Sequence, residues 1–257
     1  MIASLPMYDF GTTVAANDRL WAAIRDGLRA AGNAAPEALS RGADDLFAHW
    51  LAPDLVLSQT CGLPYRARLH GHVTLIGTPD FAVEGCPPGH YRSLFIARAA
   101  DPRAALADFD GAAFAYNDAG SQSGWAAPQA HAAGLGLHLR PALRTGGHRL
   151  SAQAVAAGKA DLAAIDAVTW RLLTRDDPAL CAALRVVGMT APSPGLPYVS
   201  ARGADTALIF DIIATAIAGL APGDRETLGL RGLVAIPAAE YLSVPTPPAP
   251  EAIVAQD

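Results

Sequence analysis

The segment with the most chemical information is residues 115–125, Ala-Tyr-Asn-Asp-Ala-Gly-Ser-Gln-Ser-Gly-Trp. A β-rich run ends there in a turn of small residues, and the pattern predicts that an amphipathic helix follows. The first turn of a helix has backbone N–H groups without intrahelical partners, and the helix dipole adds partial positive charge. Ser121 and Ser123 would add hydroxyl donors, and Gly124 would let a ligand approach the backbone closely. This segment therefore predicts a cradle for an oxyanion, built without lysine or arginine.

Several of the chemically suggestive residues also have purely structural explanations. Ser121 or Ser123 could serve only as a helix N-cap, and Asp166 could cap the helix that follows it. His148 lies just before a predicted helix and could hydrogen-bond to backbone alone. From the residues by themselves these alternatives stay open.

The histidines and cysteines give weaker signals. His70 and His72 would share one face of a strand, but no third ligand lies nearby in sequence, so we predict no metal site and no cofactor. Three cysteines are too few for a disulfide scaffold. Cys61 and Cys86 could form one bridge in an oxidising compartment, or they could pack with Cys181 as thiols.

Composition limits the class of protein. The 257 residues are 51% hydrophobic and 17% charged, which is enough apolar material for one large core or two smaller ones. The net charge of −5 argues against a nucleic-acid partner. No apolar run is long enough to cross a bilayer, so we expect no membrane insertion. The opening Met-Ile-Ala-Ser-Leu-Pro lacks the pattern of a secretory leader, which leaves a periplasmic and a cytoplasmic location open.

The elements that must position these residues alternate between β and α and suggest two lobes. We predict a discontinuous first lobe of residues 1–88 plus 190–257, and a second lobe of residues 89–189 that carries the serine cradle. The first lobe is expected to contain strands at 2–5, 55–58 and 73–77, a turn at 59–64, a helix capped by Asn17 or Asp18, and helices at 44–50 and 204–220. The second is expected to contain strands at 91–97, 112–116, 162–165 and 185–189, a strand near Leu143, a helix starting at Asp101-Pro102, a helix through Ala133, and a helix at 151–157.

Open α/β sheets usually bind ligands where strands end and helices begin. We therefore expect a cleft between the lobes to be lined by polar residues that follow strands. These are Tyr8, Gln59, Thr60, Asn117, Ser121, Ser123, His148 and Asp166. Tyr8 could instead be a core aromatic with a hydrated hydroxyl.

Four motifs in this order resemble one known family. They are Met-Tyr-Asp at 7–9, Gln-Thr-Cys-Gly at 59–62, Ser-Gln-Ser-Gly at 121–124, and Gly-His-Arg-Leu-Ser at 147–151 followed by Ala-Ile-Asp-Ala-Val-Thr-Trp at 164–170. Together they are similar to the phosphate, phosphite and phosphonate substrate-binding proteins of ABC transporters. The resemblance implies a type II periplasmic-binding-protein fold, in which two α/β lobes are joined by two crossover strands around an interlobe cleft.

The resemblance also implies roles for single residues. Ser121, Ser123 and Gly124 would hold the phosphoryl oxygens, and His148 would donate to another oxygen. Tyr8, Gln59 and Thr60 would face them from the other lobe. Asp166 would meet a ligand ammonium group or a protonated ligand oxygen, because a bare carboxylate repels a dianion.

The function expected from these residues is capture of a small phosphorus oxyanion for ABC-type uptake, by a monomer that works with a permease and is not an enzyme. One alternative is a cytosolic sensor or carrier of a related anion. A second is an enzyme on the same fold, with Cys61 as nucleophile and His148 as its base.

Overall fold

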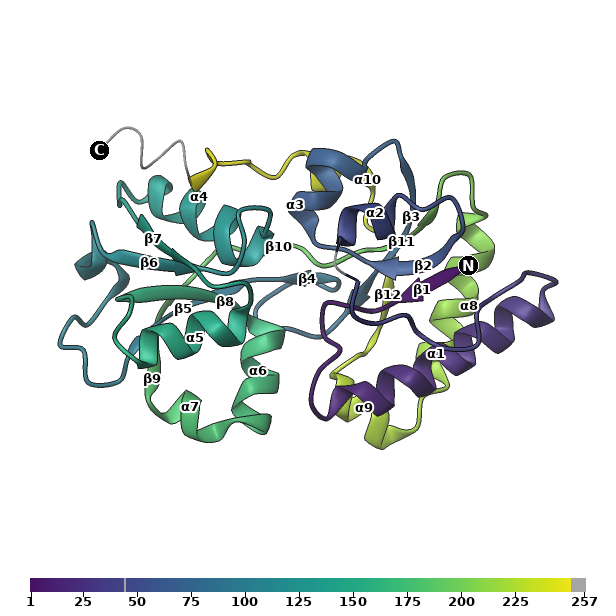
Figure 1. Cartoon of the computed structure of the whole chain (residues 1–257), viewed down its shortest axis with the longest axis horizontal. Coiled ribbons are helices and arrows are strands. Elements are labelled where there is room, and N and C mark those ends of the chain that lie inside the picture. The colour runs from purple at the N-terminus through teal and green to yellow at the C-terminus, as the bar shows by residue number, and fades with distance from the viewer. Residues whose placement is uncertain (44, 251–257) are drawn as a thin grey trace. The chain divides into compact units, whose positions relative to one another are not determined.

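The computed structural model describes residues 1–43 and 45–250. Its internal contacts divide the chain into two units, coloured by residue number in Figure 1. Unit 1 contains Met1–His90 and Pro194–Ser243, and unit 2 contains Tyr91–Ser193 and the residues from Val244 onward. This differs from the predicted division at the C-terminal segment, which we had expected in the first lobe. Its place in unit 2 has a physical basis, because the Trp125 indole N–H donates to the Pro248 carbonyl at 3.2 Å.

Unit 1 is built on a five-stranded mixed sheet in the order β1-β2-β11-β3-β12. The β1 and β2 strands are parallel, whereas β11 runs antiparallel to β2 and β3, and β12 antiparallel to β3. The strands are β1 (Ile2–Ser4), β2 (Leu55–Gln59), β3 (Val73–Asp80), β11 (Tyr198–Ala201) and β12 (Gly232–Val234). The three strands predicted for the first lobe are thus present, with somewhat different ends.

Apolar helices cover both faces of this sheet. One core cluster joins the sheet to α1 (Thr13–Ala30) and α8 (Thr206–Ala218), with α9 (Pro222–Leu228) beside them. A second cluster covers the other face with Trp50, Tyr65 and Tyr241. These three residues come from α2 (Leu46–Trp50), from a π-helical turn (Tyr65–Leu69) that follows the short α3 (Gly62–Pro64), and from α10 (Ala238–Leu242). The helical content of this region was not predicted, since we expected a simple turn at 59–64.

The start of α1 corrects the predicted cap. Asn17 lies inside the helix and is buried, where its side-chain amide donates to Asp9 Oδ1 at 3.1 Å. The helix begins at Thr13 instead, because the Thr13 hydroxyl donates to the Tyr8 carbonyl at 2.6 Å and fixes the preceding turn. The predicted apolar face of Leu20, Trp21, Ile24 and Leu28 is confirmed as buried. In the predicted helix 44–50, residue 44 lies outside the described residues, and Asp45 caps α2 by accepting from two backbone N–H groups.

Unit 2 has its own five-stranded mixed sheet in the order β7-β6-β8-β5-β9. The β6 strand is parallel to β7 and β8, and β5 is antiparallel to β8 and β9. The strands are β5 (Ser93–Arg98), β6 (Ala113–Tyr116), β7 (Arg140–Arg144), β8 (Leu162–Asp166) and β9 (Leu184–Met189). Side chains alternate between two core clusters, as the pleat of a sheet buried on both faces requires.

Figure 1 shows α4 (Ala127–Gly134) on one face of this sheet, and α5 (His148–Ala156), α6 (Ala167–Asp176) and α7 (Pro178–Ala182) on the other. The α5 helix starts three residues earlier than predicted, so His148 is its first residue. The helix predicted at Asp101-Pro102 is wrong. There the Asp101 carboxylate accepts from the backbone and side chain of Arg103 in a tight turn, and only a 3₁₀ turn (Leu106–Phe109) follows.

A separate short ladder pairs β4 (His90–Tyr91) with β10 (Ser193–Pro194), the segments in which the chain passes from one unit to the other. In the described part of the chain, no single helix is long and apolar enough to cross a membrane; only α8 and α9 taken together meet that test, and they are bent by 110°. Residues 1–43 and 45–250 contain no group of three or more His, Cys, Asp or Glu side chains that could hold a metal ion. Cys61, Cys86 and Cys181 are present as thiols, so the bridge that the sequence left open is not formed.

The contact between α1 and α8 yields a stability prediction. A Cβ added at Gly27 would lie 2.8 Å from Ile212 Cγ2, closer than packed carbon atoms tolerate. Alanine normally favours a helix over glycine by about 1 kcal/mol, but this overlap should outweigh that gain. We expect Gly27→Ala to lower the free energy of unfolding by roughly 1 kcal/mol in urea denaturation. In an Ile212→Ala background the same change should stabilise the protein; stabilisation by Gly27→Ala alone would contradict the packing described.

Candidate functional site

The serine segment leads from β6 into α4 in unit 2. A π-helical turn (Gln122–Ala126) precedes α4, and its first backbone hydrogen bond runs from Ala126 N to Ser121 O at 3.0 Å. A π turn is wider than an α turn, and such turns are frequent at functional sites. Trp125 is buried beneath the turn and packs on the Tyr116 ring, with 5.0 Å between ring centroids. The turn is therefore anchored by the core while its polar groups lie at the start of a helix.

Ser121 is the N-cap of this turn, as the structural alternative predicted. Its Oγ accepts from the Gly124 N–H at 3.0 Å, and the residue is 7% exposed. A hydroxyl that accepts one hydrogen bond still has its own hydrogen to donate. Among the described residues no acceptor for that hydrogen lies within bonding distance. The Ser121 hydroxyl is thus oriented by the backbone and remains a donor.

Ser123 is oriented by a histidine. Its Oγ lies 2.9 Å from His148 Nε2, and the same nitrogen lies 3.4 Å from Asp166 Oδ2. A carboxylate can only accept, so this position favours the tautomer with hydrogen on Nε2. If that hydrogen points to Ser123 Oγ, the serine oxygen accepts from the imidazole and the serine's own hydrogen is left to donate. The residue is 4% exposed, so this donor is almost fully desolvated.

Asp166 ends β8 and caps α6, again as its structural alternative predicted. Its Oδ1 accepts from Thr169 N at 2.9 Å, and its Oδ2 accepts from the Thr169 hydroxyl. The carboxylate is 3% exposed and also faces His148. The Asp166 side chain therefore both caps α6 and contacts His148.

Gly124 lies under two buried polar atoms. A Cβ at this position would be 1.9 Å from Asn117 Oδ1 and 3.2 Å from His148 Cε1. Asn117 Oδ1 and His148 Nδ1 are both buried, and neither finds a hydrogen-bond partner in the described structure. Buried polar atoms without partners are rare and costly. We define the cradle as the six residues that the structure brings together here: Asn117, Ser121, Ser123, Gly124, His148 and Asp166.

The cradle combines one carboxylate, Asp166, with an imidazole and contains no lysine or arginine. Burial lowers the pKa of His148 below its ordinary value, and the Asp166 carboxylate offsets this only in part. The imidazole is thus neutral near pH 7. No lysine or arginine is among the six cradle residues, so any anion there would be held by hydroxyl, amide and imidazole hydrogens.

One residue of this region was missed by sequence reasoning. Ser93, the first residue of β5, donates from its Oγ to the Ser123 carbonyl at 2.8 Å. A serine within an apolar strand carries no local signal. Only the strand register, in which Ser93 lies opposite Asp166, reveals its place beside the cradle.

The remaining candidates, Tyr8, Gln59 and Thr60, are buried in unit 1, so we describe them separately. The Tyr8 ring packs edge-on against Phe81, and Gln59 Nε2 donates to the Leu196 carbonyl at 3.2 Å. Tyr8 and Gln59 line a cavity of about 10 Å³, room for at most one water molecule. Thr60 Oγ1 is buried without a partner in the described structure. Their role as ligand contacts stays a prediction.

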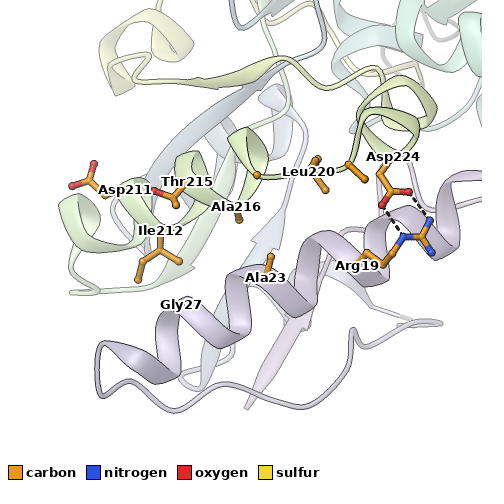
Figure 2. A pocket seen from close by; sticks show the side chains of 11 residues that line it. Arg19, Ala23, Gly27, Asp211, Ile212, Thr215, Ala216, Leu220 and Asp224 are labelled. Carbon is orange, nitrogen blue, oxygen red and sulfur yellow. Dashed lines mark hydrogen bonds and ion pairs between the residues drawn. The ribbon is translucent and has the colours of Figure 1, made fainter.

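Another hollow in unit 1 is not lined by any predicted site residue. It is a mainly apolar groove of about 610 Å³ between α1, α8 and α9. Figure 2 shows Arg19 and Asp224 hydrogen-bonded to each other at one end, with Gly27 and Ile212 toward the other. The groove presents no converging donors for an anion, so the cradle in unit 2 remains the better candidate site.

Comparison with known proteins decides the family. A family profile described as "ABC transporter, phosphonate, periplasmic substrate-binding protein" matches residues 61–241. The chain belongs to this family. The resemblance predicted from the four motifs is thereby confirmed, and the coarse function follows: members are substrate-binding transport proteins of the periplasm, not enzymes. A search of curated protein sequences found no significant match.

Solved structures establish the fold of this phosphonate-binding family member. PhnD1 from Prochlorococcus marinus (MIT 9301) in complex with methylphosphonate has a TM-score of 0.68 at 14% identity, over 93% of this chain and 94% of that one. A binding protein component of an ABC phosphonate transporter from Pseudomonas aeruginosa has a TM-score of 0.67 at 17% identity, over 93% and 82%. XAC2383 from Xanthomonas citri bound to ATP has a TM-score of 0.66 at 18% identity, over 93% and 92%. The predicted type II periplasmic-binding-protein fold is confirmed.

The tight approach of Asn117 to Gly124 gives a first test. Gly124→Ala should displace the Asn117 amide and lower the free energy of unfolding by about 1–3 kcal/mol. The matched control is Gly134→Ala in α4, where an added Cβ meets nothing within 4 Å and alanine should stabilise the helix. If both variants unfold at the same urea concentration as the parent, the contact is not formed in solution.

The buried imidazole gives a second test. The pKa of His148 is lower in the folded chain than in the unfolded chain, where histidine titrates near 6.5. The unfolded state therefore binds more protons as the pH falls below about 6.5, and stability is lost in that range. We expect the free energy of unfolding of His148→Gln, measured without ligand between about pH 7.5 and 5, to fall less steeply than that of the parent. Parallel pH profiles would mean that His148 is not buried as described.

Proposed function

We propose that this protein captures a small phosphorus oxyanion, phosphonate, phosphite or phosphate, on the cradle of unit 2. The observation that carries the proposal is the state of the two serine hydroxyls. The Ser121 oxygen accepts from Gly124 N, and with hydrogen on Nε2 the Ser123 oxygen accepts from the imidazole, so that both hydroxyl hydrogens are left to donate. Two desolvated, oriented donors beside a helix start suit the oxygens of a tetrahedral anion.

A cradle without lysine or arginine suits an anion that is selected by shape. Hydrogen bonds to charged oxygens are about twice as strong as neutral ones, and preformed donors need little reorganisation. Asn117 and His148 add polar atoms that lack partners inside the protein. Asn117 Oδ1 and, with hydrogen on Nε2, His148 Nδ1 are acceptors, so a ligand oxygen that keeps a proton would be able to donate to them.

The state of Asp166 bears on the choice of ligand. Its two oxygens are held by the Thr169 N–H and hydroxyl, and its charge faces His148. These contacts reduce its repulsion toward a nearby anion, so the ligand does not need an ammonium group. We therefore rank methylphosphonate, phosphite and phosphate ahead of 2-aminoethylphosphonate.

The arrangement favours binding over catalysis. In a Ser-His-Asp triad the serine and the aspartate use different nitrogens of the imidazole. Here Ser123 and Asp166 both approach Nε2, so the histidine cannot pass a proton between them. Since His148 is engaged in this way, its proposed service as a base for Cys61 gains no support. Family membership instead favours delivery of the bound anion to an ABC permease in the periplasm.

Melting temperatures test the proposal. Methylphosphonate, phosphite, phosphate and 2-aminoethylphosphonate are compared with sulfate and a pyrimidine phosphate. A ligand at a hundred times its Kd should add about 2.7 kcal/mol of stability. Ser123→Ala should weaken binding of the best ligand by about 1–3 kcal/mol, because it strips a donor from a buried charged oxygen.

The control for this test is Ser243→Ala, which removes an exposed hydroxyl that donates to the Glu240 carbonyl in unit 1. It should leave affinity unchanged. A thermal shift confined to sulfate or the pyrimidine phosphate would refute the ligand class. Undiminished affinity in Ser123→Ala would locate binding outside the cradle.

A further inference from the structure

We infer that Ser93 is a positioning residue of the cradle, because it fixes the Ser123–Gly124 peptide plane whose N–H orients the Ser121 hydroxyl. The inference rests on the proposed function and adds to it a residue outside the six of the cradle. Ser93 is 1% exposed and opens β5, the strand at which the chain enters the sheet of unit 2. Its hydroxyl donates to the Ser123 carbonyl at 2.8 Å and so reaches the serine turn from a distant part of the chain.

The peptide group carries this hydrogen bond to the other serine. The Ser123 carbonyl and the Gly124 N–H belong to one planar peptide group and point in opposite directions. The carbonyl is held by Ser93, and the N–H donates to Ser121 Oγ at 3.0 Å. Fixing one end of the plane therefore fixes the direction of the other. Ser93 in this way orients Ser121, although it does not touch it.

Ser93 is itself held by Thr190, which bonds both its N–H and its carbonyl. Its N–H donates to Thr190 Oγ1 at 3.0 Å, and Thr190 N donates back to the Ser93 carbonyl at 2.9 Å. The preceding residue, Arg92, accepts at its carbonyl from Ala167 N at 3.0 Å, at the start of α6. Residues 92 and 93 thus hold the starts of two helices, the one with the serine turn and the one capped by Asp166.

These contacts close a ring around the cradle. From Ser93 it runs to the Ser123 carbonyl, from Ser123 Oγ to His148 Nε2, and from there to Asp166. Asp166 lies opposite Ser93 in the β5–β8 register, which completes the ring. Loss of the Ser93 hydroxyl would leave the ring open at the Ser123 carbonyl and the peptide plane free to tilt.

The experiment compares Ser93→Ala and Ser93→Thr in the full chain. Binding of methylphosphonate is measured by calorimetry, and the Gly124 amide is followed by ¹H–¹⁵N NMR without ligand. We expect Ser93→Ala to raise Kd about tenfold, as for loss of one oriented hydrogen bond, and to shift the Gly124 amide and speed its hydrogen exchange. Ser93→Thr keeps the hydroxyl and should restore both. In a Ser121→Ala background, Ser93→Ala should cost much less affinity, because the plane then has no second serine to orient.

The matched control is Ser200→Ala in unit 1, since Ser200 is equally buried in a strand and donates to the Val56 carbonyl at 2.7 Å. It should lower the melting temperature without changing Kd or the Gly124 amide. Unchanged Gly124 resonances and exchange in Ser93→Ala would overturn the inference, even if the protein binds methylphosphonate. If the parent binds none of the phosphorus anions, the proposed function fails, but the Gly124 readout still decides the role of Ser93.

Discussion

The contact between Ser123 Oγ and His148 Nε2 is the interaction on which the site depends. It joins the turn before α4 to the first residue of α5, and Asp166 at the end of β8 approaches the same nitrogen. Three segments far apart in the chain thus meet at one nitrogen. With hydrogen on Nε2 the serine oxygen accepts, and in the proposed function its own hydrogen is then offered to the ligand. Without this assignment the cradle would be a set of mutually satisfied side chains.

In the proposed function the cradle would bind its anion through dipoles, where many anion sites use cations. An arginine fork binds an anion through charge and is strongly hydrated when empty. Neutral donors that are already buried have lost their water before the ligand arrives, and they distinguish anions by the position of oxygens rather than by total charge. For a chain with a net charge of −5, this arrangement avoids placing a positive group in the core. It also explains why the helix start and the serines occur together.

How much could be predicted from the sequence depended on the range of the interactions. The serine turn was predictable because its signals, the serines, the glycine and the start of a helix, lie within a few residues of one another. The cap of α1 was not, because the Thr13 hydroxyl bonds back to Tyr8 and sets the start earlier than Asn17. The false helix at Asp101 failed for a similar reason, since Arg103 holds its carboxylate in a turn.

Contacts between distant segments had no signal in the sequence. The place of Ser93 beside the cradle depends on strand register, which no single stretch of residues reveals. The same holds for the shared nitrogen of His148, which needs three elements to come together. The family resemblance named His148, Ser123 and Asp166 but could not say that they engage one another.

The bond between Trp125 and the Pro248 carbonyl has a practical consequence for expressing this protein. The Trp125 indole packs beneath the serine turn, and the Pro248 carbonyl holds the indole in place. Residues near Pro248 therefore help to support the turn. A purification tag that displaced Pro248 would break this hydrogen bond and disturb the turn. At the other end the Met1 ammonium pairs with Asp54 at the surface, a kind of ion pair that contributes little to stability. Removal of residue 248 would take away the acceptor of the Trp125 indole and loosen the support of the serine turn.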